Sequence, residues 1–264
     1  LLCIFKYLTF FAGITNTIFK FPKEIPQIAL PIGISFYTFQ LLSYVIDVYR
    51  QEVKPQEKFT SLLLYASLFH QCIAGPIVRY QLVADEIDNR KVKLDEYCRG
   101  IKRFTTGLAK KAILANGCAV VADSLLPLEA KELAGIPAVG IWIGLLFYGL
   151  QIYLDFSAYS DMAIGMGLMI GFHYEENFNY PYIPRSIKDF WRRWHISLSS
   201  FFRDYVYIPL GGNRKGSRRT TINLLIVWCL TGFWHGASWN YIFWGLYFFI
   251  FILMENKFLT AKLS

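Results

Sequence analysis

Two histidines lie in aromatic surroundings where an ionisable side chain requires a reason. His235 falls within the apolar sequence TGFWHGASWN (residues 231–240), and His195 falls within FWRRWHISLS (residues 190–199). An imidazole in hydrocarbon is costly unless it faces a wet cavity or a polar partner, so an intramembrane histidine indicates a functional site. It could act as a general base toward a hydroxyl, or it could only bond to a neighbouring helix.

The composition predicts that the elements holding these histidines belong to a membrane protein. The chain has 264 residues, of which 55% are hydrophobic and 18% aromatic, and its mean hydropathy is +0.34. A soluble domain of this size is rarely so apolar. The net charge of +8 does not indicate a nucleic-acid binder, because such proteins lack uncharged apolar runs of about 20 residues, the length that crosses a bilayer. We expect an all-α, polytopic membrane protein.

Six apolar segments are expected to be helical, since open backbone groups would be unpaired in lipid. They cover residues 1–21, 26–49, 59–78, 104–126, 135–172 and 220–254. The GxxxG pairs Gly140/Gly144 and Gly167/Gly171 could bring helix backbones together. The chain starts at Leu1 without an initiator Met, and we expect a fragment of a longer chain that forms one membrane-embedded domain over residues 1–264.

The segment 135–172 is too long for a single span, since a helix of this length would reach about 57 Å. We therefore expect a break near residues 154–161, which contain Asp155 and Asp161. These carboxylates could line a polar cavity, hold a positively charged partner, or only cap two helices at the break.

Charge predicts the topology. Residues 185–219 carry nine basic and two acidic residues, so the positive-inside rule places them in the cytoplasm. The loop at Glu129 and Glu132 is expected outside. The intervening chain must then cross an odd number of times, and one crossing plus a re-entrant or interfacial piece satisfies this.

The spacing within residues 186–204 predicts one interfacial amphipathic helix with His195 near its apolar edge. If the next helix starts near Thr220 at the cytoplasmic surface, His235 would lie about 22 Å deep at helical rise. His195 would then be at the rim and His235 well inside. Such an arrangement suits an enzyme that joins a cytosolic donor to an acceptor reached through the membrane.

The five cysteines are scattered and have no C-x-x-C spacing, which argues against a disulfide framework or a zinc site. We expect them to be small apolar residues, although one thiol could in principle carry an acyl group. No metal motif is evident.

Several motifs together resemble the membrane-bound O-acyltransferase (MBOAT) family. They are FWRRWHISLS, the sequence FRDYVYIPLGGN at residues 202–213, and WHGASW at residues 234–239. Residues 74–79, 154–161 and 177–182 add to the likeness, which runs from about Leu30 to Leu246. It is closest to the bacterial branch that includes the alginate O-acetyltransferase membrane subunit and the teichoic acid D-alanyl transferase, and it favours the acetyltransferases.

This resemblance implies transfer of an acyl group from a thioester to a hydroxyl within an MBOAT-like helical bundle. His235 would take the proton of the acceptor hydroxyl. His195 would position the donor or hold the developing oxyanion. Six further residues are candidates for substrate binding: Trp194, Arg203, Asp204, Trp234, Asn240 and Asp155. No bound cofactor or metal is implied, and the donor, such as acetyl-CoA, is a co-substrate.

The resemblance further implies an inner-membrane, multi-pass protein whose acceptor is an extracytoplasmic polysaccharide, reached in some cases through a partner acetyltransferase. The basic face of residues 185–219 could attract the phosphates of CoA or an acidic carrier protein, or could only reflect topology and anionic lipid. One alternative is transfer of D-alanyl or another acyl group from a carrier protein to a cell-wall polymer. A proton-coupled transporter is the alternative outside enzymes. His70 and His173 are expected to be structural or interfacial.

Overall fold

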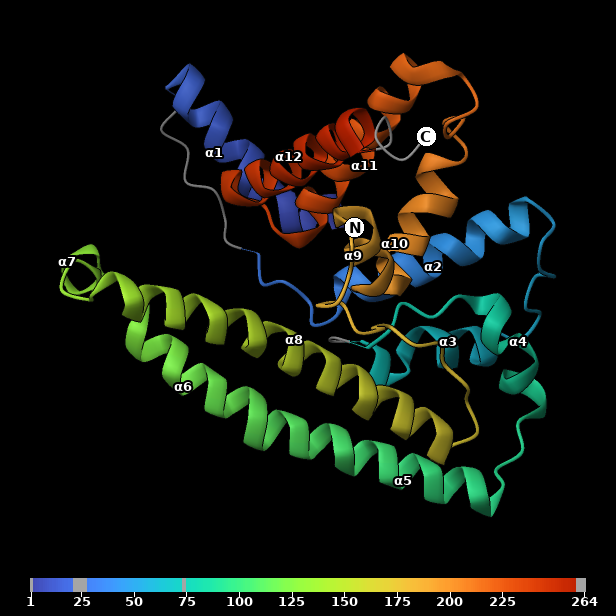
Figure 1. Cartoon of the computed structure of the whole chain (residues 1–264). Helices are drawn as coiled ribbons and strands as arrows, with labels where there is room; N and C mark the ends of the chain where they lie inside the picture. Colours follow the sequence, from blue (N-terminus) through green and yellow to red (C-terminus); the bar gives the residue numbers. More distant parts are fainter. Residues whose placement is uncertain (1, 21–27, 73–74, 260–264) are drawn as a thin grey trace. The chain divides into compact units, whose positions relative to one another are not determined.

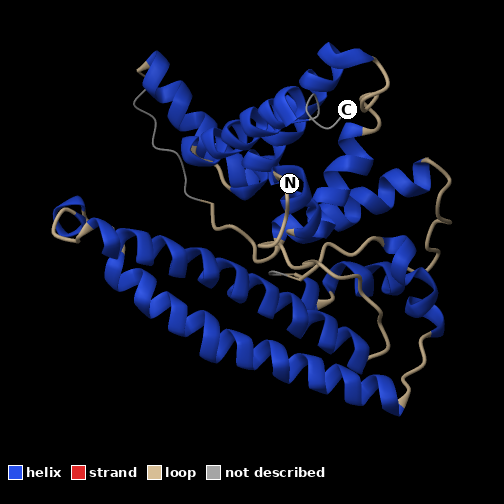
Figure 2. Cartoon of the chain, in the orientation of Figure 1, coloured by secondary structure: helices blue, strands red, loops and turns tan. Residues whose placement is uncertain are grey.

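The computed structural model describes residues 2–20, 28–72 and 75–259, and within these residues the chain is helical with no strand (Figure 2). This confirms the all-α expectation. The described chain forms two compact units. The first consists of Leu1–Leu62, Arg79–Gln81 and Phe178–Ser264, and the second of Leu63–Val78 and Leu82–Asn177. The expectation of one domain over residues 1–264 stays a prediction.

Aromatic packing and helix contacts build the first unit. Its helices are η1 (Cys3–Tyr7), α1 (Leu8–Phe19), α2 (Ile34–Tyr49), α9 (Ile187–Arg193), α10 (Ile196–Phe202), η4 (Arg203–Tyr207), α11 (Gly216–His235), α12 (Trp239–Met254) and η5 (Glu255–Leu259). Gly232 and Gly245 let the backbones of α11 and α12 touch, because a Cβ at either position would collide with a carbonyl of the other helix. Trp191 of α9 packs edge-on against Trp228 and Phe248, with ring centroids 5.0 and 4.9 Å away.

A long helical hairpin forms most of the second unit. Its elements are α3 (Phe59–Ser67) and α4 (Tyr80–Asn89), which both begin in the first unit, and then η2 (Phe69–Gln71), α5 (Leu94–Ala109), η3 (Lys110–Ala115), α6 (Asn116–Leu125), α7 (Ala130–Leu133) and α8 (Ala138–Met169). The first arm, α5–η3–α6, runs beside α8 (Figure 1). It begins ten residues before the expected segment 104–126.

The expected break in segment 135–172 is wrong, since α8 is continuous from Ala138 to Met169. The acidic residues near the expected break are paired with cations on the other arm of the hairpin. Lys111 Nζ lies 2.6 Å from Asp155 Oδ1, and Arg103 Nη2 lies 3.0 Å from Asp161 Oδ1. Because their charges are balanced by side chains, the carboxylates do not require the helix to open.

The single helix expected over residues 186–204 is also wrong. Helix α9 ends at Arg193, and α10 starts at Ile196 after His195, whose φ of +44° lies in the left-handed region. This backbone conformation is uncommon outside glycine and stops a right-handed helix. The start of α9 is fixed by Ser186 Oγ, which accepts from Asp189 N at 3.1 Å, and by Glu255, whose Oε2 accepts from Ile187 N at 2.7 Å.

Two other expectations change in detail. The segment 220–254 is two helices, α11 and α12, separated at residues 236–238. The pair Gly167/Gly171 does not join two helices, because Gly167 packs against Tyr174 just beyond α8, and Gly171 has a φ of +84° in the turn after that helix. Gly144, in contrast, does lie against Leu125 and Leu126 at the other end of the hairpin.

One helix among the described residues, α8, is both long and apolar enough to cross a membrane, and Cys3–Phe19 is a shorter apolar helical stretch. A polytopic arrangement therefore stays a prediction.

Candidate active site

His195 is buried at the junction between α9 and α10. Only 2% of its surface is exposed, and its ring centroid lies 5.7 Å from that of Trp234 on α11. Its Nδ1 lies 3.5 Å from Ser197 Oγ. Burial, and secondly the proximity of His235, lower the pKa of His195 to about 3. The imidazole is therefore neutral at physiological pH, so one ring nitrogen can accept a proton and the other can donate a hydrogen bond from its N–H.

His235 is the last residue of α11, next to the break that precedes α12. Its ring lies edge-on to Trp244, with centroids 4.8 Å apart, and parallel to Tyr241 at 6.2 Å. Gly236 follows in an extended conformation, and a Cβ at this glycine would overlap the Tyr241 ring. The residue after His235 therefore has to be glycine, because a side chain at position 236 would push Tyr241 and α12 away from the histidine.

Trp234 connects the two histidines. Its ring contacts His195 and, at 4.9 Å, His235. Its Nε1 donates to the carbonyl oxygen of Ser35 on α2 at 3.3 Å, and its ring lies 6.1 Å from Phe39 one turn further along that helix. Of the candidate site residues, the structure therefore brings His195, Trp234 and His235 together, with α2 holding the tryptophan.

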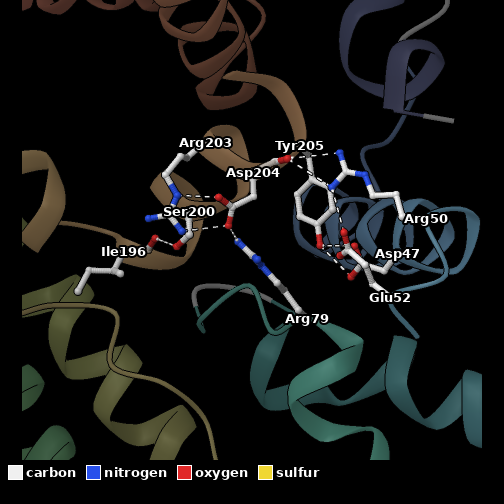
Figure 3. Close-up of polar contacts among 9 residues, drawn as sticks. All are labelled: Asp47, Arg50, Glu52, Arg79, Ile196, Ser200, Arg203, Asp204 and Tyr205. Atoms are coloured by element: carbon white, nitrogen blue, oxygen red, sulfur yellow. Dashed lines mark hydrogen bonds and ion pairs between the residues drawn. The ribbon is translucent and has the colours of Figure 1, made fainter. Parts of the chain in front are cut away.

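Arg203 and Asp204, both expected to bind substrate, lie in η4 directly after α10 and are already engaged with the protein (Figure 3). Asp204 Oδ1 accepts from Arg203 Nε at 2.6 Å, and Asp204 Oδ2 accepts from Arg79 Nη2 at 2.6 Å. Burial alone would raise the pKa of Asp204, but hydrogen bonds from Arg203 and Arg79 outweigh it and lower the pKa. Asp204 therefore anchors η4 in this structure.

Tyr205 extends this network to α2 (Figure 3). Its hydroxyl donates to the carboxylate of Asp47, 2.8 Å from each oxygen, and Asp47 is fully buried. The guanidinium carbons of Arg50 and Arg79 lie 5.4 and 5.2 Å from the centroid of the Tyr205 ring. The network therefore fixes η4, and with it α10, on the same helix that holds Trp234.

Sequence reasoning missed Asp47, Arg79 and Tyr205 as members of the region near the site. Asp47 offered a signal, because it is an acidic residue within the apolar segment 26–49. Arg79 ends the motif at residues 74–79, of which Ala74 lies outside the described residues. Tyr205 gave no signal of its own beyond membership of a family motif.

The remaining candidates of the first unit have different surroundings. Trp194 stacks on Phe190, with centroids 5.6 Å apart, and meets Phe178 edge-on at 5.1 Å. Asn240 is exposed in the first turn of α12. Trp194 therefore packs against α9 and against the chain that precedes it. Asn240, in contrast, is exposed five residues after His235.

Asp155 belongs to the second unit, where Lys111 neutralises it. The sequence left three alternatives for Asp155: lining a polar cavity, holding a positively charged partner, or capping a helix. Its contact with Lys111 agrees with the second. His70, also in this unit, is buried, and its Nε2 lies 2.6 Å from Tyr174 Oη. His173 is exposed, with Nδ1 2.6 Å from Glu86 Oε1. No group of three or more His, Cys, Asp or Glu side chains in the described residues could hold a metal.

Comparisons with known proteins show the family to which the chain belongs. The profile of the membrane-bound O-acyltransferase family matches residues 57–261, so the chain belongs to that family. The family and the bacterial branch expected from the motifs are both confirmed.

Named relatives indicate the range of chemistry in this branch. The chain is 44% identical to a probable alginate O-acetylase of Pseudomonas putida, over 96% of this chain and 52% of the relative. It is 39% identical to a peptidoglycan O-acetyltransferase of Helicobacter pylori, over 93% of this chain and 51% of the relative. It is 31% identical to a teichoic acid D-alanyltransferase of Streptococcus thermophilus, over 88% of this chain and 58% of the relative. The chain therefore spans about half the length of the curated relatives it matches.

Proposed function

We propose that this chain forms the reaction centre of a membrane O-acetyltransferase that moves an acetyl group from a thioester to a hydroxyl of an extracytoplasmic polysaccharide. The observation that carries the proposal is the pair of histidines whose rings both contact Trp234. Family membership supports acyl transfer. The relatives named as alginate and peptidoglycan O-acetyltransferases support acetyl as the group and a polysaccharide as the acceptor.

The residues can be given defined roles. His235, as a neutral imidazole, takes the proton of the acceptor hydroxyl while that oxygen attacks the thioester carbonyl carbon. The carbonyl oxygen becomes an oxyanion, which an N–H of His195 stabilises. Collapse of this intermediate breaks the carbon–sulfur bond, and the departing thiolate receives the proton held by His235. The products are an acetyl ester and a free thiol.

The proposed donor is a cytosolic thioester such as acetyl-CoA. Residues 185–219 are proposed to face the cytoplasm of a multi-pass inner-membrane protein, so that Arg203 and the basic cluster at residues 214–219 lie on the donor side. The acceptor is reached from the other side, directly or through a partner acetyltransferase. In this arrangement Trp194, Trp234 and Asn240 would contact substrate.

The test is transfer of labelled acetyl from acetyl-CoA in membranes that carry the full-length protein. His235→Ala and His195→Ala are compared with wild type at matched expression. Loss of a general base lowers rates by about 10²- to 10⁴-fold, so we expect at least such a loss for His235→Ala. His173→Ala is the matched control, because it removes an exposed histidine that lies in the other unit, where its partner is Glu86.

Three outcomes would contradict the proposal in different ways. Equal transfer in wild type, His235→Ala and His195→Ala would make the histidines structural and return the proton-coupled transporter to consideration. Transfer of D-alanyl from a carrier protein, without transfer of acetyl, would assign the chemistry of the D-alanyltransferase relative instead. An equal loss in His173→Ala would show that the assay reports folding.

A further inference from the structure

Glu255 connects the end of α12 to the start of α9. It is the first residue of η5, directly after α12 ends at Met254, and its side chain is buried. Its Oε2 accepts from the backbone N–H groups of Ile187 at 2.7 Å and Lys188 at 3.3 Å. These bonds join residues 68 and 67 positions apart in the sequence. A buried carboxylate at the end of one helix therefore caps the first turn of another.

The first turn of α9 obtains most of its hydrogen-bond acceptors from this distant carboxylate. An α-helix leaves the N–H groups of its first turn without partners inside the helix. In α9, Ile187 and Lys188 donate theirs to Glu255, and Asp189 donates its own to Ser186 Oγ. The negative charge suits the positive end of the helix dipole, and Lys188 Nζ lies 3.8 Å from Glu255 Oε1. Because a local side chain such as Ser186 can cap this turn, the remote cap does more: it fixes where α9 lies.

Both ends of this connection lead to the proposed reaction centre. His195 follows two residues after α9 ends. Helix α12 packs on α11, which ends at His235, and the ring centroid of Trp244 on α12 lies 4.8 Å from that of His235. Trp191, in the middle of α9, lies 5.7 Å from the same Trp244. Helix α9 is therefore held against the helices of His235 at two places, in its middle by Trp191 and at its start by Glu255.

We propose that Glu255 is a positioning residue for the proposed acetyl transfer, because its carboxylate holds α9 against α12 and so sets the placement of His195 relative to His235. The inference rests on the proposed function. A helix of seven residues is about 10 Å long, so a shift at its start is passed on to its end. In the proposed reaction one histidine takes a proton while the other stabilises the oxyanion, so both must be placed correctly at once.

The experiment measures acetyl transfer from acetyl-CoA by purified full-length variants, with rates expressed per folded molecule after size-exclusion chromatography in detergent. Glu255→Ala removes the acceptor, and we expect its kcat to fall about 10²-fold, the loss typical of a misplacement of about 1 Å. The KM for acetyl-CoA should stay near that of wild type, because the oxyanion contact is made only in the transition state. Glu255→Gln keeps an acceptor oxygen of the same reach without the charge, so it should recover most of the rate.

Ser186→Ala is the matched control, because it removes the other side-chain cap of the same turn and leaves the connection to α12 intact. Both alanine variants should lower the melting temperature, since each leaves an N–H group of α9 without its acceptor. Only Glu255→Ala should lower kcat per folded molecule. If Glu255→Ala does not fold, Glu255→Asp takes its place: it keeps the charge but is one methylene shorter, so its kcat should lie below that of Glu255→Gln.

The outcomes separate this inference from the proposed function. If His235→Ala abolishes transfer while kcat is the same in Glu255→Ala and Ser186→Ala, the enzyme assignment stands and Glu255 only caps a helix. A faster rate in Glu255→Asp than in Glu255→Gln would assign the effect to charge and would likewise overturn the positioning role. If His235→Ala transfers acetyl normally, the proposed function itself fails, whatever the result for Glu255.

Discussion

The junction at His195 shows how one residue can serve both backbone and chemistry. Trp194 is extended and ends α9, and His195 then takes a left-handed φ before α10, with its ring 5.7 Å from that of Trp234. A histidine placed in the middle of a regular helix would have presented its ring with the periodicity of its neighbours. Because non-glycine residues rarely adopt this conformation, the surrounding packing must stabilise it, a pattern often found at functional sites.

Burial of His195 gives a prediction for stability against pH. Its pKa in the folded protein, about 3, lies below the ordinary value of 6.5, so the unfolded chain binds a proton that the folded chain does not in the interval between them. Stability should therefore fall as pH decreases through 6.5 toward 3. Between pH 7.5 and 5.5 the loss from this residue is about 1 kcal/mol.

The measurement is the melting temperature of the purified full-length protein in detergent at these two pH values. His195→Gln keeps a similar volume without a group that titrates, so its melting temperature should change less with pH than that of wild type. His173→Gln is the control, since this histidine is exposed and lies in the other unit. The same pH dependence in wild type and His195→Gln would show that His195 does not stay neutral on folding.

At the scale of elements, close backbone contact joins α5 to α8 in the second unit. A Cβ on Gly165 would lie 2.7 Å from Phe104 N and 2.8 Å from Gly100 O, and a Cβ on Gly107 would lie 2.8 Å from Ala158 O. These distances are shorter than real contacts, so each position admits only glycine without movement of the backbone. Ion pairs of Asp155 and Asp161 lie along the same two arms.

Gly165→Ala should therefore destabilise the hairpin by about 1–3 kcal/mol, the range for overpacking a close contact. Gly117→Ala provides the matched control. Gly117 lies on α6, and a Cβ at this position would meet nothing within 4 Å. Alanine is a better helix former than glycine, so this control should be neutral or stabilise the protein by about 0.5–1 kcal/mol. Thermal unfolding of the full-length variants would compare the two, and equal effects would contradict the close contact.

These elements also show what the sequence could and could not predict. Apolar segments predicted the helices, and the aromatic motifs predicted that His195 and His235 matter, because both signals are local. The periodicity of residues 186–204 fits a helix, so only tertiary packing could reveal the break at His195. Likewise, the length of segment 135–172 suggested a broken helix, and the sequence alone could not show that Asp155 pairs with Lys111 on the neighbouring arm of the hairpin. Glu255 and Asp47 act across long separations in sequence, which no local pattern reports.

At the scale of the whole molecule, the distribution of charge and the length of α8 together predict how the chain crosses the membrane. A helix of 32 residues is about 48 Å long, more than the roughly 30 Å of hydrocarbon that it needs to cross. Its first half is apolar, with Val139, Trp142 and Leu146 exposed, whereas Asp155 and Asp161 lie in its second half. Because α8 is longer than the hydrocarbon layer, its second half can reach the membrane interface. The paired carboxylates of Asp155 and Asp161 are tolerated there.

This arrangement predicts that residues 126–137 and residues 185–219 lie on opposite sides of the membrane. The five native cysteines, of which Cys3 and Cys98 are exposed, would first be replaced, and single cysteines introduced at Glu129 and at Lys215 in the full-length protein. With a membrane-impermeant maleimide we expect labelling of Glu129→Cys from the outside and of Lys215→Cys only in inverted vesicles. Labelling of both from the same side would mean that α8 enters and leaves by one face, and would place the acyl donor and the loop before α8 in the same compartment.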